Sequence, residues 1–289
     1  RQIMIGSGLV EAMPNPFLAP DDVSKAGLSV ENPVQLLNPL AVEESVLRPS
    51  LLPGLLTSVG YNYSHRNRGV RLFETGAVFG ASNDSTSSLP DEYEQLAALL
   101  SDSDAASAVG LLRELGDGLK VELSLINTDD LPGLHPTRGA RICIGEIEIG
   151  SVGEIDPVVL ERYEIDDRCA WLDLRLDQII QAAIADSDVP YEPVSTFPSS
   201  DVDLAFLVDE GVQASAIELT LRNAAGDELQ DLQLFDVFRS DQIDQGSRSL
   251  AFSIRLQAKD RTLTEEEVGG LRQRCIEAVE ASHKATLRS

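Results

Sequence analysis

The chain has 289 residues, enough for two domains of ordinary size, and 43% of them are hydrophobic, which suffices for well-packed cores. Its formal net charge of −25, from 23 Lys and Arg against 48 Asp and Glu, argues against a protein that covers nucleic acid with a broad basic surface. Any contact with RNA must therefore be local and made by a few cations. The simpler interpretation is an acidic surface that keeps the protein in solution.

Three cysteines, Cys143, Cys169 and Cys275, stand far apart in the sequence. Their spacing predicts neither a disulfide framework nor a zinc site and fits a reducing compartment such as the cytoplasm. No apolar run approaches the ~20 residues that a membrane-spanning helix needs, so we expect no membrane contact. Because the chain begins at Arg1 without a Met, we expect it to be part of a longer protein.

The segment from Asn38 to Phe79 contains a loop, a helix and a strand in that order. Asn-Pro pairs predict the loop, because the residue before a proline favours extended backbone over helix. The strand, Leu72 to Phe79, places Glu74 among apolar neighbours, where a carboxylate needs a partner. The helix carries one apolar stripe at helical spacing, made of Leu51, Leu52, Leu55, Leu56 and Val59.

Beyond this segment, apolar alternation predicts mostly strands, with one longer helix over residues 105–115 that Gly116 is expected to end. Gly150 and Gly153 are expected to form a tight turn between strands rather than a phosphate cradle, because no Lys-Ser or Lys-Thr pair follows them. Strands are predicted at residues 120–126, 141–144, 146–149 and 171–176, a loop at 134–139, and either a strand or a helix at 93–100.

Prolines at positions 190, 193 and 198 mark a linker, so we place a domain boundary between residues 189 and 190. The remaining hundred residues have an order of their own. Strands are predicted at residues 202–208, 232–238, 250–256 and 286–287, with helices at 214–221 and from the Thr264–Glu267 capping box to 279. This βαββαβ order is the ferredoxin-like split motif.

Short motifs in three parts of the chain occur in the order found in one family. The first set is Asn-Pro-Leu (38–40), Leu-Arg-Pro-Ser-Leu-Leu-Pro-Gly-Leu-Leu (47–56) and Phe-Glu-Thr-Gly (73–76). The second set is His-Pro-x-Arg (135–138) and Ile-Gly-x-Val-Gly-Glu-Ile-x-Pro (149–157). The third is Phe-Asp-Val-Phe (235–238), Ser-Leu-Ala (249–251) and Arg-Thr-Leu-Thr (261–264). Together they resemble the C-terminal half of the β subunit of bacterial phenylalanyl-tRNA synthetases.

The resemblance implies an α+β chain of two domains. Residues 1–189 would form a class II synthetase-like antiparallel sheet with flanking helices, and residues 190–289 a ferredoxin-like anticodon-binding domain. Active class II modules hold ATP with arginines beside the motif glutamates. Here Arg71 alternates to the strand face opposite Glu74, and no Arg follows Glu154. We therefore expect an inactive, catalytic-like module with no catalytic and no metal-binding residues.

The resemblance also implies partners. The family's complete enzyme is a heterotetramer of two α and two β subunits that joins phenylalanine to tRNA(Phe) with ATP and Mg²⁺, neither of which is expected on this piece alone. The stripe from Leu51 to Val59 is the candidate contact with the α subunit, and burial within its own domain is the alternative.

For the second domain, the resemblance and the need for aromatic faces and cations at unpaired bases select seven candidates. Phe235 and Phe238 alternate to opposite faces of a strand, so we expect one of them in the core. Family members commonly carry an Arg directly before the Asp that matches Asp203, and this Arg is missing here. Because of this departure, the alternative remains that the chain is a non-enzymatic acidic interaction module that has lost RNA binding. The RNA candidates are Phe235, Phe238, Arg239, Arg248, Ser249, Lys259 and Arg261.

Overall fold

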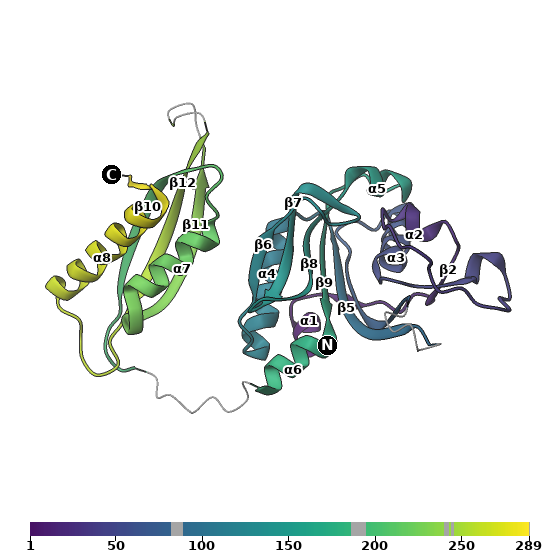
Figure 1. Cartoon of the computed structure of the whole chain (residues 1–289), viewed down its shortest axis with the longest axis horizontal. Helices are drawn as coiled ribbons and strands as arrows, with labels where there is room; N and C mark the ends of the chain where they lie inside the picture. Colours follow the sequence, from purple (N-terminus) through teal and green to yellow (C-terminus); the bar gives the residue numbers. More distant parts are fainter. Residues whose placement is uncertain (82–88, 186–194, 240–242, 244–245, 289) are drawn as a thin grey trace. The chain divides into compact units, whose positions relative to one another are not determined.

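The computed structural model describes residues 1–81, 89–185, 195–239, 243 and 246–288. The chain divides into two compact units, Arg1–Val189 and Pro190–Ser289 (Figure 1). Most of the linker that the prolines at positions 190, 193 and 198 predict lies outside the described residues.

A seven-stranded sheet forms the centre of the first unit. Its first strand runs parallel to its neighbour, and every other pair of neighbours is antiparallel. In order across the sheet, the strands are β1 (Val10–Glu11), β4 (Arg71–Gly80), β5 (Asp91–Ser101), β9 (Cys169–Arg175), β8 (Ile147–Ile155), β7 (Leu134–Ile144) and β6 (Ser124–Asn127). The ambiguous segment 93–100 is thus a strand.

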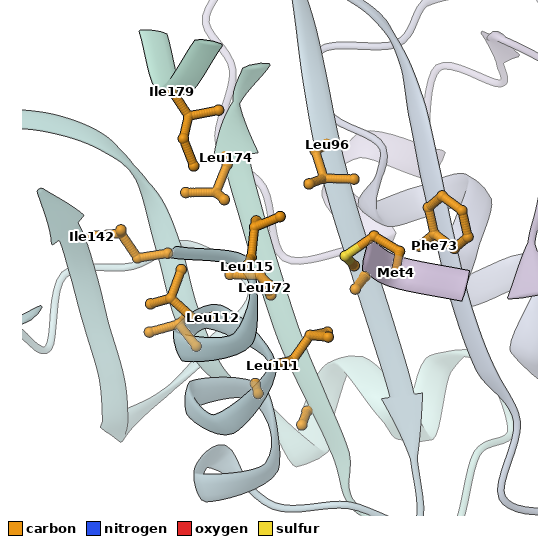
Figure 2. Close-up of a cluster of buried hydrophobic side chains, with 14 of the residues drawn as sticks. Met4, Phe73, Leu96, Leu111, Leu112, Leu115, Ile142, Leu172, Leu174 and Ile179 are labelled. Carbon is orange, nitrogen blue, oxygen red and sulfur yellow. The ribbon is translucent and has the colours of Figure 1, made fainter. Parts of the chain in front are cut away.

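Helices cover both faces of this sheet (Figure 1). One core packs α1 (Gln2–Gly6), α4 (Ala105–Leu119) and α6 (Leu176–Ala185) against residues such as Phe73 and Leu172, as Figure 2 shows. The other core packs α3 (Leu52–Ser64) and α5 (Pro157–Arg162) against Leu72 and Val78. Neighbouring strand residues thus enter different cores, as the alternation predicts. The short elements beside α3 are β2 (Phe17–Leu18), α2 (Asp22–Lys25), the 3₁₀ turn Val42–Glu44 and β3 (Val46–Leu47).

Two predictions about glycines are wrong. Gly116 lies inside α4, which continues to Leu119 and ends at Lys120 in the left-handed conformation. Gly150 and Gly153 lie inside β8 rather than in a turn. At both of these positions a Cβ atom would collide with the backbone of a neighbouring strand, so glycine allows close strand packing there.

Other boundaries shift as well. The predicted loop 134–139 belongs to β7, where the register with β8 is irregular between Leu134 and Gly139. The predicted strand 120–126 is shorter and begins at Ser124. The irregular register explains the first error, because an alternating pattern cannot show a strand that bulges out of its pairing.

The second unit has the predicted ferredoxin-like order. Its four strands pair antiparallel as β11-β12-β10-β13, and the two helices share the core that covers one sheet face. The predicted Thr264–Glu267 capping box opens the last helix. Its elements are β10 (Ser200–Asp209), α7 (Ala214–Ala225), the 3₁₀ turn Gly226–Glu228, β11 (Leu229–Phe238), β12 (Ser247–Leu256), α8 (Glu265–His283) and β13 (Thr286–Leu287).

Candidate functional site

Glu74 finds its partner in Arg48, which lies in the loop just before α3. The Arg48 Nη1 atom donates to Glu74 Oε1 over 2.6 Å, and its Nε atom donates to the Ala77 carbonyl over 2.9 Å. Both charged side chains are buried. Gly76 leaves room for the guanidinium, which a Cβ atom at that position would meet. Three motif residues, Arg48, Glu74 and Gly76, therefore form one buried contact that ties the loop to β4.

The apolar stripe of α3 is not a free surface. Leu51, Leu52, Leu55, Leu56 and Val59 are each at most 2% exposed and pack in the core between α3 and the sheet. The prediction that these five residues form an outer contact surface is wrong, and the alternative of burial within their own unit is what the structure shows. The sheet face needs a covering layer, and this helix provides it.

A different part of the first unit exposes apolar side chains. We call the side chains of Leu37, Leu40 and Val42 the apolar protrusion; all three are largely exposed to solvent. The loop that carries them, residues 36–45, is closed by backbone hydrogen bonds; in one of these, the Leu36 amide donates to the Ser45 carbonyl over 2.9 Å. It lies beside β2 and extends away from the seven-stranded sheet (Figure 1). Three exposed apolar side chains within six residues make this loop a candidate contact site.

Glu154, at the end of β8, accepts four hydrogen bonds from three residues. Arg138 Nη1 donates to Oε2 over 2.9 Å, Arg168 donates from Nε to Oε2 over 3.0 Å and from Nη2 to Oε1, and the Ala105 amide at the start of α4 donates to Oε1 over 3.1 Å. Burial raises the pKa of Glu154, but these hydrogen bonds outweigh it and hold the pKa at about 2. The carboxylate thus joins three elements of the first unit.

Acid should therefore weaken the first unit. The pKa of Glu154 falls from an ordinary 4.5 to about 2 on folding, so its contribution is complete above pH 4.5 and is lost as the pH falls toward 2. We expect about 1–3 kcal/mol of unfolding free energy to be lost over this window. The measurement is urea unfolding followed by Trp171 fluorescence, with Glu154→Gln as the matched variant. The difference in unfolding free energy between wild type and Glu154→Gln should shrink as the pH falls. A difference that stays constant with pH would contradict this role of Glu154.

A further polar network crosses the same sheet. Asp173 on β9 accepts hydrogen bonds from Ser151, from Trp171 Nε1 at 2.9 Å and from Gln95 Nε2 at 2.9 Å. Gln95 Oε1 in turn accepts from the Leu51 amide at 3.0 Å, where α3 begins. Loss of solvent raises the pKa of Asp173, and these hydrogen bonds only partly offset that effect. These polar side chains hold the sheet to its covering helix.

In the second unit, one end of the sheet gathers four of the seven candidates. Phe238 pairs with Ser249 across β11 and β12, and Arg239 and Arg248 follow and precede them in sequence. The Arg288 guanidinium lies over the Phe238 ring, 5.0 Å from its centroid. Lys259 and Arg261 follow the other end of β12, about 30 Å along a strand of this length. The structure therefore splits six of the candidates into two groups, and the seventh, Phe235, lies on β11 three residues before Phe238.

The expectation that one phenylalanine enters the core is wrong. A register shift between Leu234 and Asp236 interrupts the alternation of β11, and Phe235 stands at this bulge. Phe235 is 55% exposed and Phe238 is 38% exposed. Both rings are therefore accessible on the strand at the edge of the sheet.

The candidate arginines are already engaged with protein groups. Arg239 donates to Glu210 Oε1 from Nε at 3.0 Å and from Nη2 at 2.5 Å. Arg248 Nη2 donates to the Val212 carbonyl over 2.8 Å. At the other end of the sheet, Arg261 bonds to Asp260 and to Glu267. An RNA phosphate must compete with these acceptors.

Comparison with known proteins identifies the family. Residues 1–176 match the family described as the phenylalanyl tRNA synthetase beta chain CLM domain. The chain belongs to the phenylalanyl-tRNA synthetase β-chain family. Residues 195–288 match the ferredoxin-fold anticodon binding domain. The resemblance drawn from the motifs is thereby confirmed at the level of the family.

Relatives named phenylalanine–tRNA ligase beta subunit match the chain from end to end. The protein from Geobacillus kaustophilus is 34% identical over 100% of this chain, and that from Clostridium tetani is 33% identical over 99% of it. The chain spans only 37% of the length of either relative. This β-chain family member thus corresponds to a part of those proteins.

Solved structures show the fold of the synthetase module. The pyrrolysyl-tRNA synthetase PylSc of Desulfitobacterium hafniense shares a TM-score of 0.52 with this β-family chain at 17% identity, covering 64% of this chain and 66% of that one. A second structure of the enzyme from the same organism gives a TM-score of 0.51 at 16% identity. At this identity the likeness concerns the fold alone, and it confirms the predicted synthetase-like α+β architecture.

Two residues of the candidate RNA surface escaped the sequence prediction for this β-family chain. Arg288 reaches Phe238 from the end of the chain, and Glu210 reaches Arg239 from the turn after β10. Neither residue belongs to a motif that carries the family resemblance. Only the strand pairing brings them to the end of the sheet where Phe238 lies. Within the described residues, no group of three or more His, Cys, Asp or Glu could hold a metal ion, and no helix is long and apolar enough to span a membrane.

Proposed function

We propose that the chain is a C-terminal piece of the β subunit of a cytoplasmic phenylalanine–tRNA ligase. Its second unit binds the anticodon arm of tRNA(Phe), and its first unit supports assembly with the α subunit in a heterotetramer. The observation that carries the RNA role is the anticodon-binding domain match of residues 195–288. The exposed Phe235 and Phe238 rings add two stacking surfaces for unpaired bases.

We propose no reaction step for the first unit. Glu74 and Glu154 stand in the motifs that resemble the ATP-binding strands of active modules. Each of them, however, forms ion pairs with arginines of its own unit. Arg71, three residues before Glu74, is exposed. ATP and Mg²⁺ belong to the reaction of the whole ligase, and we assign no residue of this chain to either.

The proposed contact with the α subunit is the apolar protrusion of Leu37, Leu40 and Val42. Residues 29–45 hold three glutamates and no Lys or Arg, so an apolar surface edged with cations would complement them. A second copy of this acidic chain would meet like charges there. We therefore propose that the α subunit supplies an apolar pocket with a basic rim.

RNA binding is tested with a hairpin that has the sequence of the tRNA(Phe) anticodon arm. Phe238→Ala should weaken binding by about 1–3 kcal/mol, because one aromatic face for a base is lost. The measurement is fluorescence anisotropy at fixed low salt. Leu219→Ala on α7, which also removes an exposed apolar side chain, serves as the control and should leave the affinity unchanged. Equal affinities of all three proteins would argue against stacking on Phe238.

A further inference from the structure

One carboxylate lies between two arginines of the candidate RNA surface. Glu210 stands in the turn after β10, and its amide donates to the Gly246 carbonyl over 2.7 Å, which ties this turn to the start of β12. Its Oε1 atom accepts from Arg239 and lies 3.8 Å from Arg248 Nη1. A single oxygen therefore faces two guanidinium groups.

Arg248 is held as a fixed donor rather than as a free surface cation. Its side chain is only 18% exposed, and the Val212 carbonyl anchors its Nη2 atom. Its Nε atom is buried and has no hydrogen-bond partner in the described part of the chain. A buried donor without an acceptor is costly, so the site offers more donors than the Glu210 carboxylate fills.

The two arginines lie at the same end of the sheet as Phe238. Arg248 precedes Ser249, which pairs with Phe238, and Arg239 follows Phe238 directly. Successive strand residues point to opposite faces, so Arg248 shares the face of the core residue Leu250 rather than that of the Phe238 ring. An RNA strand that stacks a base on Phe238 would reach the arginines with a neighbouring phosphate that passes around this end of the sheet. Guanidinium groups suit phosphate because they offer several donors in one plane to its oxygens.

We propose that Arg239 and Arg248 form a binding site for a phosphodiester group of RNA, and that the Glu210 carboxylate occupies this site until the phosphate displaces it. The inference rests on the RNA-binding role proposed above and adds the competing residue. Displacement is feasible because Glu210 is partly exposed, and exposed ion pairs contribute little stability. A phosphodiester has two non-bridging oxygens that share its negative charge, so each arginine can donate to its own oxygen, whereas Glu210 Oε1 now faces both arginines.

The test compares two carboxylate replacements that change the net charge equally. Glu210→Gln should raise affinity for the anticodon-arm hairpin about 3- to 10-fold at low salt, because the competing anion is gone. Asp201→Asn is the matched control: it breaks the exposed pair with Arg255 and lies at the start of β10, at the end of the strand away from the Glu210 turn. It should change affinity less than about 2-fold. Adding Arg239→Gln to Glu210→Gln should abolish the gain.

Equal effects of Glu210→Gln and Asp201→Asn, or weaker binding by Glu210→Gln, would overturn the inference. A second readout separates it from the RNA role itself. The Arg248 Nε–H resonance of the Glu210→Gln protein should shift on titration with inorganic phosphate, and the wild-type resonance should shift less. This response without any RNA binding would refute the RNA role and keep the anion site, whereas RNA binding with no such response would refute the site.

Discussion

Replacing Arg48 by Ala should destabilise the first unit by about 3–5 kcal/mol. Glu74 would remain buried on β4 without its cation, and an uncompensated charge in an apolar setting is among the most costly single changes. The Ala77 carbonyl would lose its donor as well. Unfolding by urea, followed by the fluorescence of the single tryptophan, Trp171, reports on this unit alone because that residue lies in its core.

A double variant distinguishes the cost of an unpaired buried charge from the cost of losing the Arg48 side chain itself. Arg48→Met combined with Glu74→Leu removes both charges and should recover most of the lost stability. Arg175→Ala, which breaks the exposed pair with Asp177 in the same unit, is the control and should cost less than about 1 kcal/mol. If Arg48→Ala cost no more than Arg175→Ala, the buried pair would not hold the loop to β4 as described.

The combined change Leu37→Asp and Leu40→Asp should weaken the complex with the purified α subunit at least about 100-fold. Both side chains are exposed in the isolated chain, so the stability of the first unit should stay unchanged. A carboxylate buried in an apolar pocket without a partner would oppose binding. The measurement is isothermal titration calorimetry with the α subunit from the same organism.

Leu219→Asp serves as the control, because it places the same charge on an exposed leucine of the second unit. It should leave the affinity for the α subunit within about 2-fold of wild type. A complex that forms equally well with all three proteins would place the contact elsewhere. Failure of the unaltered chain to form any complex would contradict the proposed assembly role itself.

Sequence patterns predicted where helices and strands lie better than they predicted what those elements pack against. The strand predicted at Leu72 to Phe79 is present in β4, and its alternation sends Phe73 to one core and Leu72 and Val78 to the other, because successive strand residues point to opposite faces. The stripe of α3 shows the limit of such reasoning. Helical spacing reveals that one face is apolar but not whether it packs on its own sheet or on another chain.

The missed features share a different cause. Glu74 was recognised as needing a partner, yet Arg48 stands 26 residues away and only the fold brings the two together. The bulge at Phe235 breaks the period of two without any glycine or proline to mark it. The same holds for Glu210, since a contact between a turn and a distant strand leaves no local pattern. Long-range pairing therefore sets the chemistry of the candidate site.

Footprinting of tRNA(Phe) tests the central claim most directly. Hydroxyl-radical cleavage of the full-length transcript would be mapped with and without the chain at saturating concentration and low salt. We predict protection confined to the anticodon stem and loop, fading as salt rises because phosphate contacts release counterions. Protection of the acceptor arm alone would contradict the assignment of the second unit. Absence of protection throughout the tRNA would instead favour an acidic interaction module without RNA binding.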